Sequence, residues 1–153
     1  KGYLMESLEA EFKRAKALHT DLSIIILDLD HFKKVNDTHG HDAGDYVLKE
    51  VTALVRTKVL PKEAIFGRYG GEEFVIILPK TGLEAATQLG EHMRATIEKH
   101  QFVYEGKRIP VTASIGVAEN ALDVDSQTAL FKLADKAIYQ AKHGGRNQVC
   151  TAS

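Results

Sequence analysis

Hydrophobic and polar positions change period along the chain, and these changes predict its helices and strands. Apolar residues recur at helical spacing in four segments, which are predicted to be helices: 3–18, 42–58, 81–100 and 126–143. Short apolar or alternating runs between them are predicted to be strands: 22–29, 65–69, 73–78, 102–104, 109–118 and 148–151. Both faces of the first run are apolar, which predicts a central strand. Polar residues at helix starts predict N-caps at Asp42 and Ser126, and Thr81 with Glu84 matches a capping box.

The elements follow in the order α, β-α-β-β-α-β, with an extra helix and strand at the C-terminal end. This order is typical of an α+β, ferredoxin-like βαββαβ core, which has a mostly antiparallel central sheet and both main helices on one face. In such a core the first strand lies beside the central hairpin. The end of strand 22–29 is therefore predicted to bring Asp28 and Asp30 close to Glu72 and Glu73.

Composition narrows the class of protein. The 153 residues are 44% hydrophobic and 27% charged, with 3 Pro and 12 Gly, which indicates one globular domain over 1–153 and argues against fibrous and disordered classes. A net charge of −1 lacks the basic excess typical of proteins that bind nucleic acid or an anionic membrane surface. No apolar run approaches the ~20 residues of a membrane-spanning helix, and the N-terminal stretch does not resemble a signal peptide. The single cysteine, Cys150, fits a reducing compartment.

Clustered carboxylates suggest a cation. Acids crowded at a strand end and an adjacent turn repel one another unless a positive charge compensates them. Oxygen ligands without Cys or His favour Mg²⁺ or Mn²⁺, and Mg²⁺ held by one or two carboxylates keeps positions that substrate phosphates fill. The alternative is that Asp28 and Asp30 simply end a strand in water. Gly70-Gly71 is likewise open to two interpretations: a tight hairpin turn, or a turn that exposes main-chain N–H groups to phosphate.

Residues 68–74, which read Arg-Tyr-Gly-Gly-Glu-Glu-Phe, resemble the signature of the GGDEF family of diguanylate cyclases in its GGEEF form. Four further stretches agree with the family in order and spacing: 28–37, 40–45, 114–118 and 134–147. The resemblance therefore spans nearly the whole chain.

The resemblance implies an enzyme, a nucleotidyltransferase that condenses two GTP molecules into cyclic di-GMP and pyrophosphate, with one GTP on each domain of a homodimer. It implies two Mg²⁺ or Mn²⁺ ions per site, held by Asp28 and Glu72, which would be the catalytic residues, and by the main-chain carbonyl of Leu29. Glu73 is a weaker ligand candidate, because its side chain alternates away from Glu72 on the strand. Asp30 is given a supporting or structural role.

The resemblance also implies residues for the base and the phosphates. Asn36 and Asp45 would read guanine, although Asp45 could also complete a cap at its helix start. Phosphate contacts would come from the following residues: Lys33, Gly70, Gly71, Lys142 and Arg146. The alternatives are that Lys142 and Arg146 interact with the dipole of their helix and that Lys33 is an ordinary surface lysine.

One departure from the family concerns product inhibition. Many members carry an Arg-x-x-Asp inhibitory site for cyclic di-GMP shortly before the Gly-Gly turn, but residues 61–64 here read Pro-Lys-Glu-Ala. Lysine cannot reproduce the bidentate grip of arginine. No product-inhibition site is expected.

The resemblance also implies that the domain is part of a regulated protein. The chain begins where a preceding family segment would end, so it is expected to be a domain excised from a longer protein with an upstream sensory or regulatory domain, in the cytoplasm or at the cytoplasmic face of a membrane. The sequence leaves three alternatives: a non-catalytic module that binds GTP or cyclic di-GMP, a cyclase for hybrid dinucleotides, and a ferredoxin-like domain without a ligand. The intact acidic motifs argue against the first and the last, and Asp45 argues for guanine.

Overall fold

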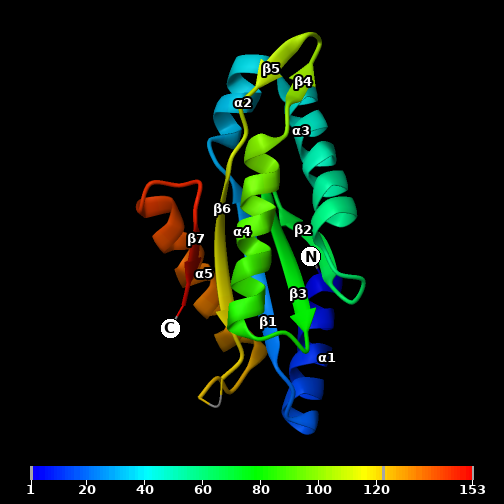
Figure 1. Ribbon diagram of the computed structural model, residues 1–153, viewed down its shortest axis with the longest axis vertical. Coiled ribbons are helices and arrows are strands. Elements are labelled where there is room, and N and C mark those ends of the chain that lie inside the picture. Colours follow the sequence, from blue (N-terminus) through cyan, green and yellow to red (C-terminus); the bar gives the residue numbers. More distant parts are fainter. Residues whose placement is uncertain (1, 122, 153) are drawn as a thin grey trace.

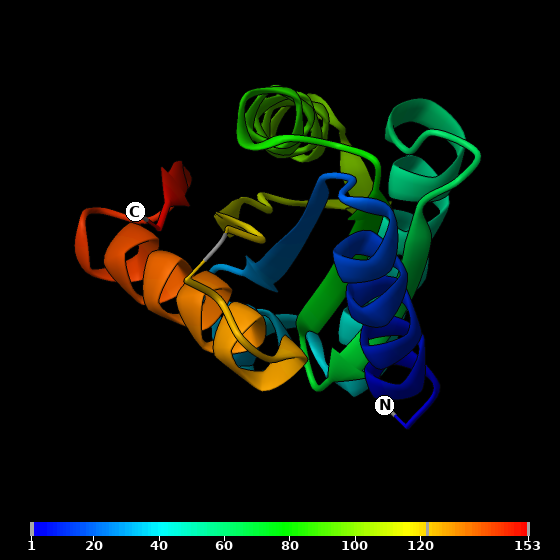
Figure 2. The same cartoon turned by 90° about the horizontal axis from the view of Figure 1, so that it is seen from below.

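The computed structural model describes residues 2–121 and 123–152, in which helices cover both faces of one five-stranded sheet (Figures 1 and 2). The helices are α1 (Gly2–Leu18), α2 (Phe32–His39), α3 (His41–Leu54), the π-helical turn η1 (Val55–Val59), α4 (Leu83–Lys99) and α5 (Gln127–His143). The strands are β1 (Leu22–Leu29), β2 (Ile65–Gly70), β3 (Glu73–Pro79), β4 (Phe102–Tyr104), β5 (Lys107–Ile109), β6 (Ala113–Glu119) and β7 (Val149–Thr151).

The strand order of the sheet is β2-β3-β1-β6-β7. All pairs are antiparallel except the parallel pair of β6 and β7, while β4 and β5 form a separate hairpin. The sequence-predicted α+β, ferredoxin-like fold with its extra C-terminal helix and strand is confirmed.

Strand β1 is buried along its whole length, because helices cover both of its faces. Ile25 and Leu27 pack with α3 and α4 on one face, whereas Ile24 and Ile26 pack with α1 and α5 on the other. Figure 2 shows the two layers of helices on opposite sides of the strands. The apolar character of both faces of this segment thus reflects its central position.

Several local predictions were wrong. Helix α2 was not predicted, since its eight residues are mostly polar and bury only Val35. Helix α3 begins at His41, with Gly40 in the N-cap position, so Asp42 lies in the first turn and is not the cap. The run 109–118 is not one strand, because residues 110–112 separate β5 from β6. Of the described helices, none is both long and apolar enough to cross a membrane.

The start of α4 is capped from outside the helix. Gly82 occupies the N-cap position, and the Leu83 N–H donates to Oε2 of Glu119 at 2.8 Å. The Thr81 hydroxyl donates instead to the Pro79 carbonyl, so the predicted capping box is wrong. The Ser126 cap is confirmed by the N–H of Ala129, which donates to its Oγ at 3.1 Å.

Candidate functional site

A hollow of about 340 Å³ lies where α2 and α3 approach the turn between β2 and β3. Five residues that the sequence assigned to guanine, phosphate or metal line it together: Lys33, Asn36, Asp45, Gly71 and Glu72. Four further lining residues were missed: Phe32, His41, Leu48 and Arg68. The helical spacing of Phe32 and Asn36, and of Asp45 and Leu48, was the available signal, but it becomes informative only once α2 is recognised.

The β2–β3 turn is shaped by Gly71 and Arg68. Gly71 has φ +50°, a left-handed conformation that glycine accepts without strain. The Nε of Arg68 donates to the Gly71 carbonyl at 2.7 Å. The turn is therefore held in place at the pocket edge, beside Glu72.

Helices α2 and α3 approach each other closely at Gly44. A Cβ atom added there would lie 1.9 Å from Oδ1 of Asn36 and 3.2 Å from Cζ of Phe32. The absence of a side chain at Gly44 thus leaves room for the Asn36 amide in the pocket wall.

The acidic centre lies next to this pocket. Asp28 at the end of β1 is only 5% exposed and is opposite Glu73 in the antiparallel register. The Leu29 N–H donates to the main-chain carbonyl of Glu72 at 3.3 Å. The predicted meeting of the strand end and the hairpin is therefore observed.

Lys142 of α5 reaches the same centre. Its Nζ donates to Oδ2 of Asp28 at 2.5 Å, which ties the end of α5 to the end of β1. Burial raises the pKa of Asp28 above its ordinary value, and Lys142 only partly offsets this effect. Burial also raises the pKa of Glu73, and the charge of Asp28 raises it further. The site thus lacks positive charge relative to its acids.

The donor chemistry fits a hard divalent cation. Asp28, Glu72 and Glu73 offer carboxylate oxygens. Within residues 2–121 and 123–152 there is no cluster of three or more Asp, Glu, His or Cys side chains that could hold a metal ion. Mg²⁺ commonly takes one or two protein carboxylates and completes its shell with water and substrate phosphate. The residues present therefore suit a cation that is held by only one or two protein carboxylates.

Asp30 is occupied by hydrogen bonds within the protein. It is 8% exposed, and its carboxylate accepts from Ser114 Oγ at 2.6 Å, Thr112 Oγ1 at 2.8 Å and the Asn147 N–H at 3.0 Å. These contacts join β1, β6 and the turn that follows α5.

Three of the predicted phosphate contacts lie outside the pocket lining: Lys142, which bonds to Asp28, and also Gly70 and Arg146. Gly70 is exposed at the end of β2, and Arg146 is exposed in the turn between α5 and β7. Arg146 has φ +63°. The structure therefore gathers the guanine candidates more tightly than the phosphate candidates.

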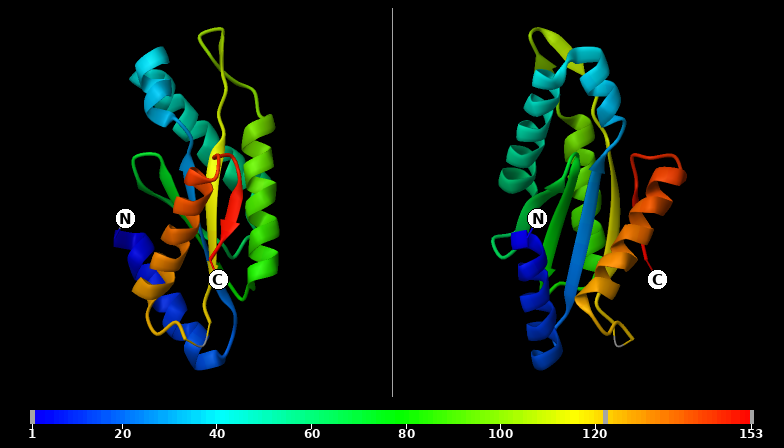
Figure 3. Two further views of the ribbon diagram at one scale, coloured as in Figure 1. Left: turned by 90° about the vertical axis from the view of Figure 1, so that its left-hand side faces the viewer. Right: turned by 180° about the vertical axis from the view of Figure 1, so that it is seen from behind.

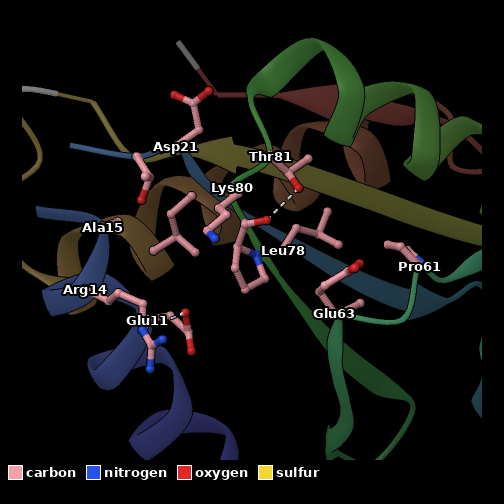
Figure 4. Close-up of a pocket in the computed structure, with 13 residues that line it drawn as sticks. Glu11, Arg14, Ala15, Asp21, Pro61, Glu63, Leu78, Lys80 and Thr81 are labelled. Atoms are coloured by element: carbon pink, nitrogen blue, oxygen red, sulfur yellow. Dashed lines mark hydrogen bonds and ion pairs between the residues drawn. The ribbon is translucent and has the colours of Figure 1, made fainter. Parts of the chain in front are cut away.

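A larger hollow, of about 560 Å³, lies at the other end of the sheet (Figure 4). It is lined by the end of α1, the start of β1, the end of β3 and the loop containing Pro61 and Glu63. Glu11, Asp21 and Glu63 mix there with Arg14 and Lys80. None of the predicted site residues is part of its lining, so the smaller pocket beside Asp28 is the candidate site.

The sequence matches the family described as "Diguanylate cyclase, GGDEF domain" over residues 1–148. The chain belongs to this family. This GGDEF domain is 43% identical over 128 residues to Diguanylate cyclase A of Treponema denticola, which covers 84% of the chain and 34% of that protein. It thus spans about a third of the length of that curated relative.

Solved structures share the fold of this GGDEF domain. The active GGEEF domain of a diguanylate cyclase from Vibrio cholerae has a TM-score of 0.94 and 35% identity, with 100% of this chain and 96% of that chain covered. The coiled coil and GGDEF domain of DgcB from Caulobacter crescentus, in complex with c-di-GMP, has a TM-score of 0.93 and 29% identity, with 99% and 80% covered.

Proposed function

We propose that this GGDEF domain condenses two molecules of GTP into cyclic di-GMP with release of two pyrophosphates. The observation that carries the proposal is the single pocket that joins Asn36 and Asp45 to Lys33, Gly71 and Glu72. Membership of the diguanylate cyclase family supports it.

Asn36 and Asp45 would select guanine. A carboxylate accepts from the N1–H and the 2-amino group of guanine, and an amide binds the remaining polar edge. Adenine lacks that pair of donors. Phe32 and Leu48 supply apolar surface beside the two readers.

Asp28, Glu72 and the Leu29 carbonyl would hold two Mg²⁺ or Mn²⁺ ions, with Glu73 as a weaker ligand. When bound, such ions neutralise charge on the departing pyrophosphate and lower the pKa of the attacking hydroxyl. Lys142 would leave Asp28 and donate to phosphate oxygens instead. The rest of the triphosphate would be bound by Lys33, Arg146 and the exposed N–H groups of the β2–β3 turn.

The reaction needs two domains. The 3′-oxygen of each GTP forms a bond to the α-phosphorus of the other while the bond from that phosphorus to the β-phosphate oxygen breaks. Two pyrophosphates leave, and the two hydroxyl protons are released. A two-fold homodimer presents each 3′-hydroxyl to the facing phosphate. We place the domain in the cytoplasm, where GTP is available, under the control of an upstream sensory or regulatory domain.

The test is incubation with GTP and Mg²⁺ at several protein concentrations, with chromatographic separation of cyclic di-GMP. Asp28→Asn and Glu72→Gln should nearly abolish turnover, since removal of one group that stabilises transition-state charge costs about 10²–10³ in rate. Asp45→Ala should lower the preference for GTP over ATP, whereas Asp42→Ala, an exposed change on the same helix outside the pocket lining, should not. GTP binding without product would favour a non-catalytic module instead.

We also propose that cyclic di-GMP does not inhibit through residues 61–64, because the arginine fork is missing there. Inhibition kinetics with added product test this. Submicromolar noncompetitive inhibition of the wild-type domain that is lost when residues 61–64 are replaced would contradict it.

A further inference from the structure

The turn between α5 and β7 holds three consecutive residues in left-handed backbone conformations. The φ angles are +119° at Gly145, +63° at Arg146 and +44° at Asn147. Left-handed conformations are unfavourable for side chains other than glycine and persist only when surrounding contacts maintain them. Contacts made by Asn147 do this from two directions.

Asn147 is bonded through both its backbone and its side chain. Its N–H donates to Oδ2 of Asp30 at 3.0 Å. Its Oδ1 accepts from Nη1 of Arg94 at 2.9 Å, and its Nδ2 donates to Oε2 of Glu98 at 2.7 Å. Both polar atoms of the amide are therefore paired with α4. The left panel of Figure 3 shows β7 lying between α5 and α4, which brings this turn within reach of α4.

Arg94 is itself fixed by acids on α4. It donates from Nε and Nη2 to the two oxygens of Glu91, at 2.9 and 2.6 Å, and from Nη1 to Glu98 at 2.9 Å. Its side chain is 17% exposed, although Glu91 and Glu98 are 56% and 44% exposed. The planar guanidinium offers a rigid set of donors that lysine cannot reproduce.

The other end of this chain of contacts reaches the acidic centre. Asp30, which accepts from Asn147, is two residues beyond Asp28, and Asp28 accepts from Lys142. The segment from Lys142 to Asn147 is thus tied to the end of β1 at both of its ends. Arg146 lies within this segment, next to Asn147.

We propose that Arg94, Glu98 and Asn147 are positioning residues for the triphosphate of the substrate. They hold the turn after α5 in the position in which Lys142 and Arg146 face the triphosphate. This inference rests on the proposed function, because it assumes that Lys142 and Arg146 bind phosphate. The three residues act through the turn and not on the base, since Asn36 and Asp45 lie on α2 and α3.

The contacts are separate from the packing that keeps α4 in the fold. Met93 and Ile97 of α4 are fully buried in the core and do not depend on the hydrogen bonds among Arg94, Glu98 and Asn147. Loss of these hydrogen bonds should therefore release the turn while leaving the fold intact.

The central test uses Arg94→Ala and Asn147→Gly. Glycine accepts the left-handed conformation, so Asn147→Gly removes the side-chain contacts without straining the backbone. Both variants should raise KM for GTP about tenfold, the lower end of what loss of a residue that supports a metal ligand costs in affinity or activity. The GTP-to-ATP preference should stay within twofold of the wild type. Arg94→Lys should not restore KM.

Arg14→Ala is the matched control, because Arg14 also faces a glutamate three residues away on its helix but lies far from the site. Calorimetry supplies a second readout: the affinity for GTP with Mg²⁺ should fall about tenfold in Arg94→Ala, whereas that for guanosine, which lacks phosphates, should not change. Arg94→Ala should weaken GTP binding less in an Arg146→Ala background than in the wild type, because only Lys142 then remains to be positioned.

Affinities and KM values equal to those of Arg14→Ala would overturn the inference, as would equal losses for GTP and guanosine. A wild-type domain that binds GTP but makes no cyclic di-GMP would refute the proposed function and leave the calorimetric comparison decisive. A wild-type domain that does not bind GTP at all would refute both.

Discussion

At the scale of single residues, Asp28 is a proposed metal ligand whose burial lowers the stability of the fold. Its carboxylate is almost fully buried, and burial raises its pKa above the ordinary value of 3.8 despite the contact with Lys142. Because the folded protein binds this proton more tightly than the unfolded chain, ionisation of Asp28 works against folding. The resulting loss of folding stability begins as the pH rises above 3.8 and reaches its full size once the pH exceeds the raised pKa of the folded state.

Asp28→Asn should therefore raise the melting temperature of the metal-free domain at neutral pH while it nearly abolishes turnover. The gain over the wild type should shrink as the pH is lowered toward 4, since the pH then approaches 3.8, the ordinary pKa below which Asp28 is mostly neutral in the folded and the unfolded state alike. Melting curves between pH 4 and 8 without divalent ions measure this. A lower melting temperature than the wild type at pH 7 would mean that the Lys142 contact outweighs the cost of burial.

Gly44 belongs to the same scale, because one absent Cβ leaves room for the Asn36 amide. Gly44→Ala should displace Asn36 and reduce the GTP-to-ATP preference roughly tenfold, the equivalent of one hydrogen bond of about 1.4 kcal/mol. Competition kinetics with the two nucleotides measure it. Gly90→Ala is the control, since it places the same methyl group on α4 against the tips of Ile115 and Val117. An unchanged preference in Gly44→Ala would argue against base recognition by Asn36.

At the scale of elements, the contact between β6 and α5 is decided at Gly116. A Cβ there would lie 2.4 Å from the Ile138 nitrogen and 2.6 Å from the Ala134 carbonyl oxygen. Both atoms belong to the backbone of α5, so they cannot rotate away as a side chain can. The helix that carries Lys142 can lie this close to the sheet only because residue 116 is glycine.

Gly116→Ala should destabilise the domain by about 3 kcal/mol, at the upper end of what overpacking usually costs, because α5 must shift as a whole. Urea unfolding measures the loss. Gly67→Ala is the matched strand control: the atoms nearest its Cβ would be Cγ and the two Cδ atoms of the Leu4 side chain, each at 3.2 Å, and no backbone atom is among them. Equal stability of the two variants would contradict a rigid contact between α5 and β6.

At the scale of the whole molecule, the antiparallel sheet gathers the site at one end. At this end, the end of β1 meets the start of β3, and the segments that lead to α2 and β7 lie beside them. The hollow of Figure 4 lies at the opposite end of the sheet. Asn36 and Asp45, the proposed guanine readers, line one pocket together, whereas the proposed reaction joins two guanine nucleotides. Under this proposal, catalysis depends on how two molecules meet.

The rate per domain should therefore rise with protein concentration and level off once dimers predominate. Initial rates over a hundredfold range of concentration, at saturating GTP and Mg²⁺, measure this dependence. The sedimentation velocity of the same samples shows whether the rise follows the dimer fraction. A constant rate per domain from a monomeric protein would contradict a reaction shared between two domains.

The sequence by itself determined the fold, because its elements follow from local periods. The predicted topology and the resemblance to the GGDEF family then pointed to Asp28, Glu72 and Glu73 as the acids of the proposed site. Strand β1 is apolar on both faces along its whole length, and the helical spacing of apolar residues repeats over several turns in α3, α4 and α5. Each of these patterns is therefore a strong signal. Once the βαββαβ order was known, the topology placed Asp28 beside Glu73. Helix α2 escaped prediction because a short polar helix with one buried residue has almost no hydrophobic period.

Only the tertiary structure decided which polar groups meet across long stretches of chain. Glu119 caps α4 from 36 residues away, Arg94 reaches Asn147 over 53 residues, and Asp30 accepts from Asn147 over 117. A hydrogen bond depends on distances of about 3 Å and on the direction of single atoms, neither of which leaves a periodic trace in the sequence. Hydrophobic patterning therefore encodes where the helices and strands lie along the chain, whereas the hydrogen bonds that support the proposed site form only after these elements have packed.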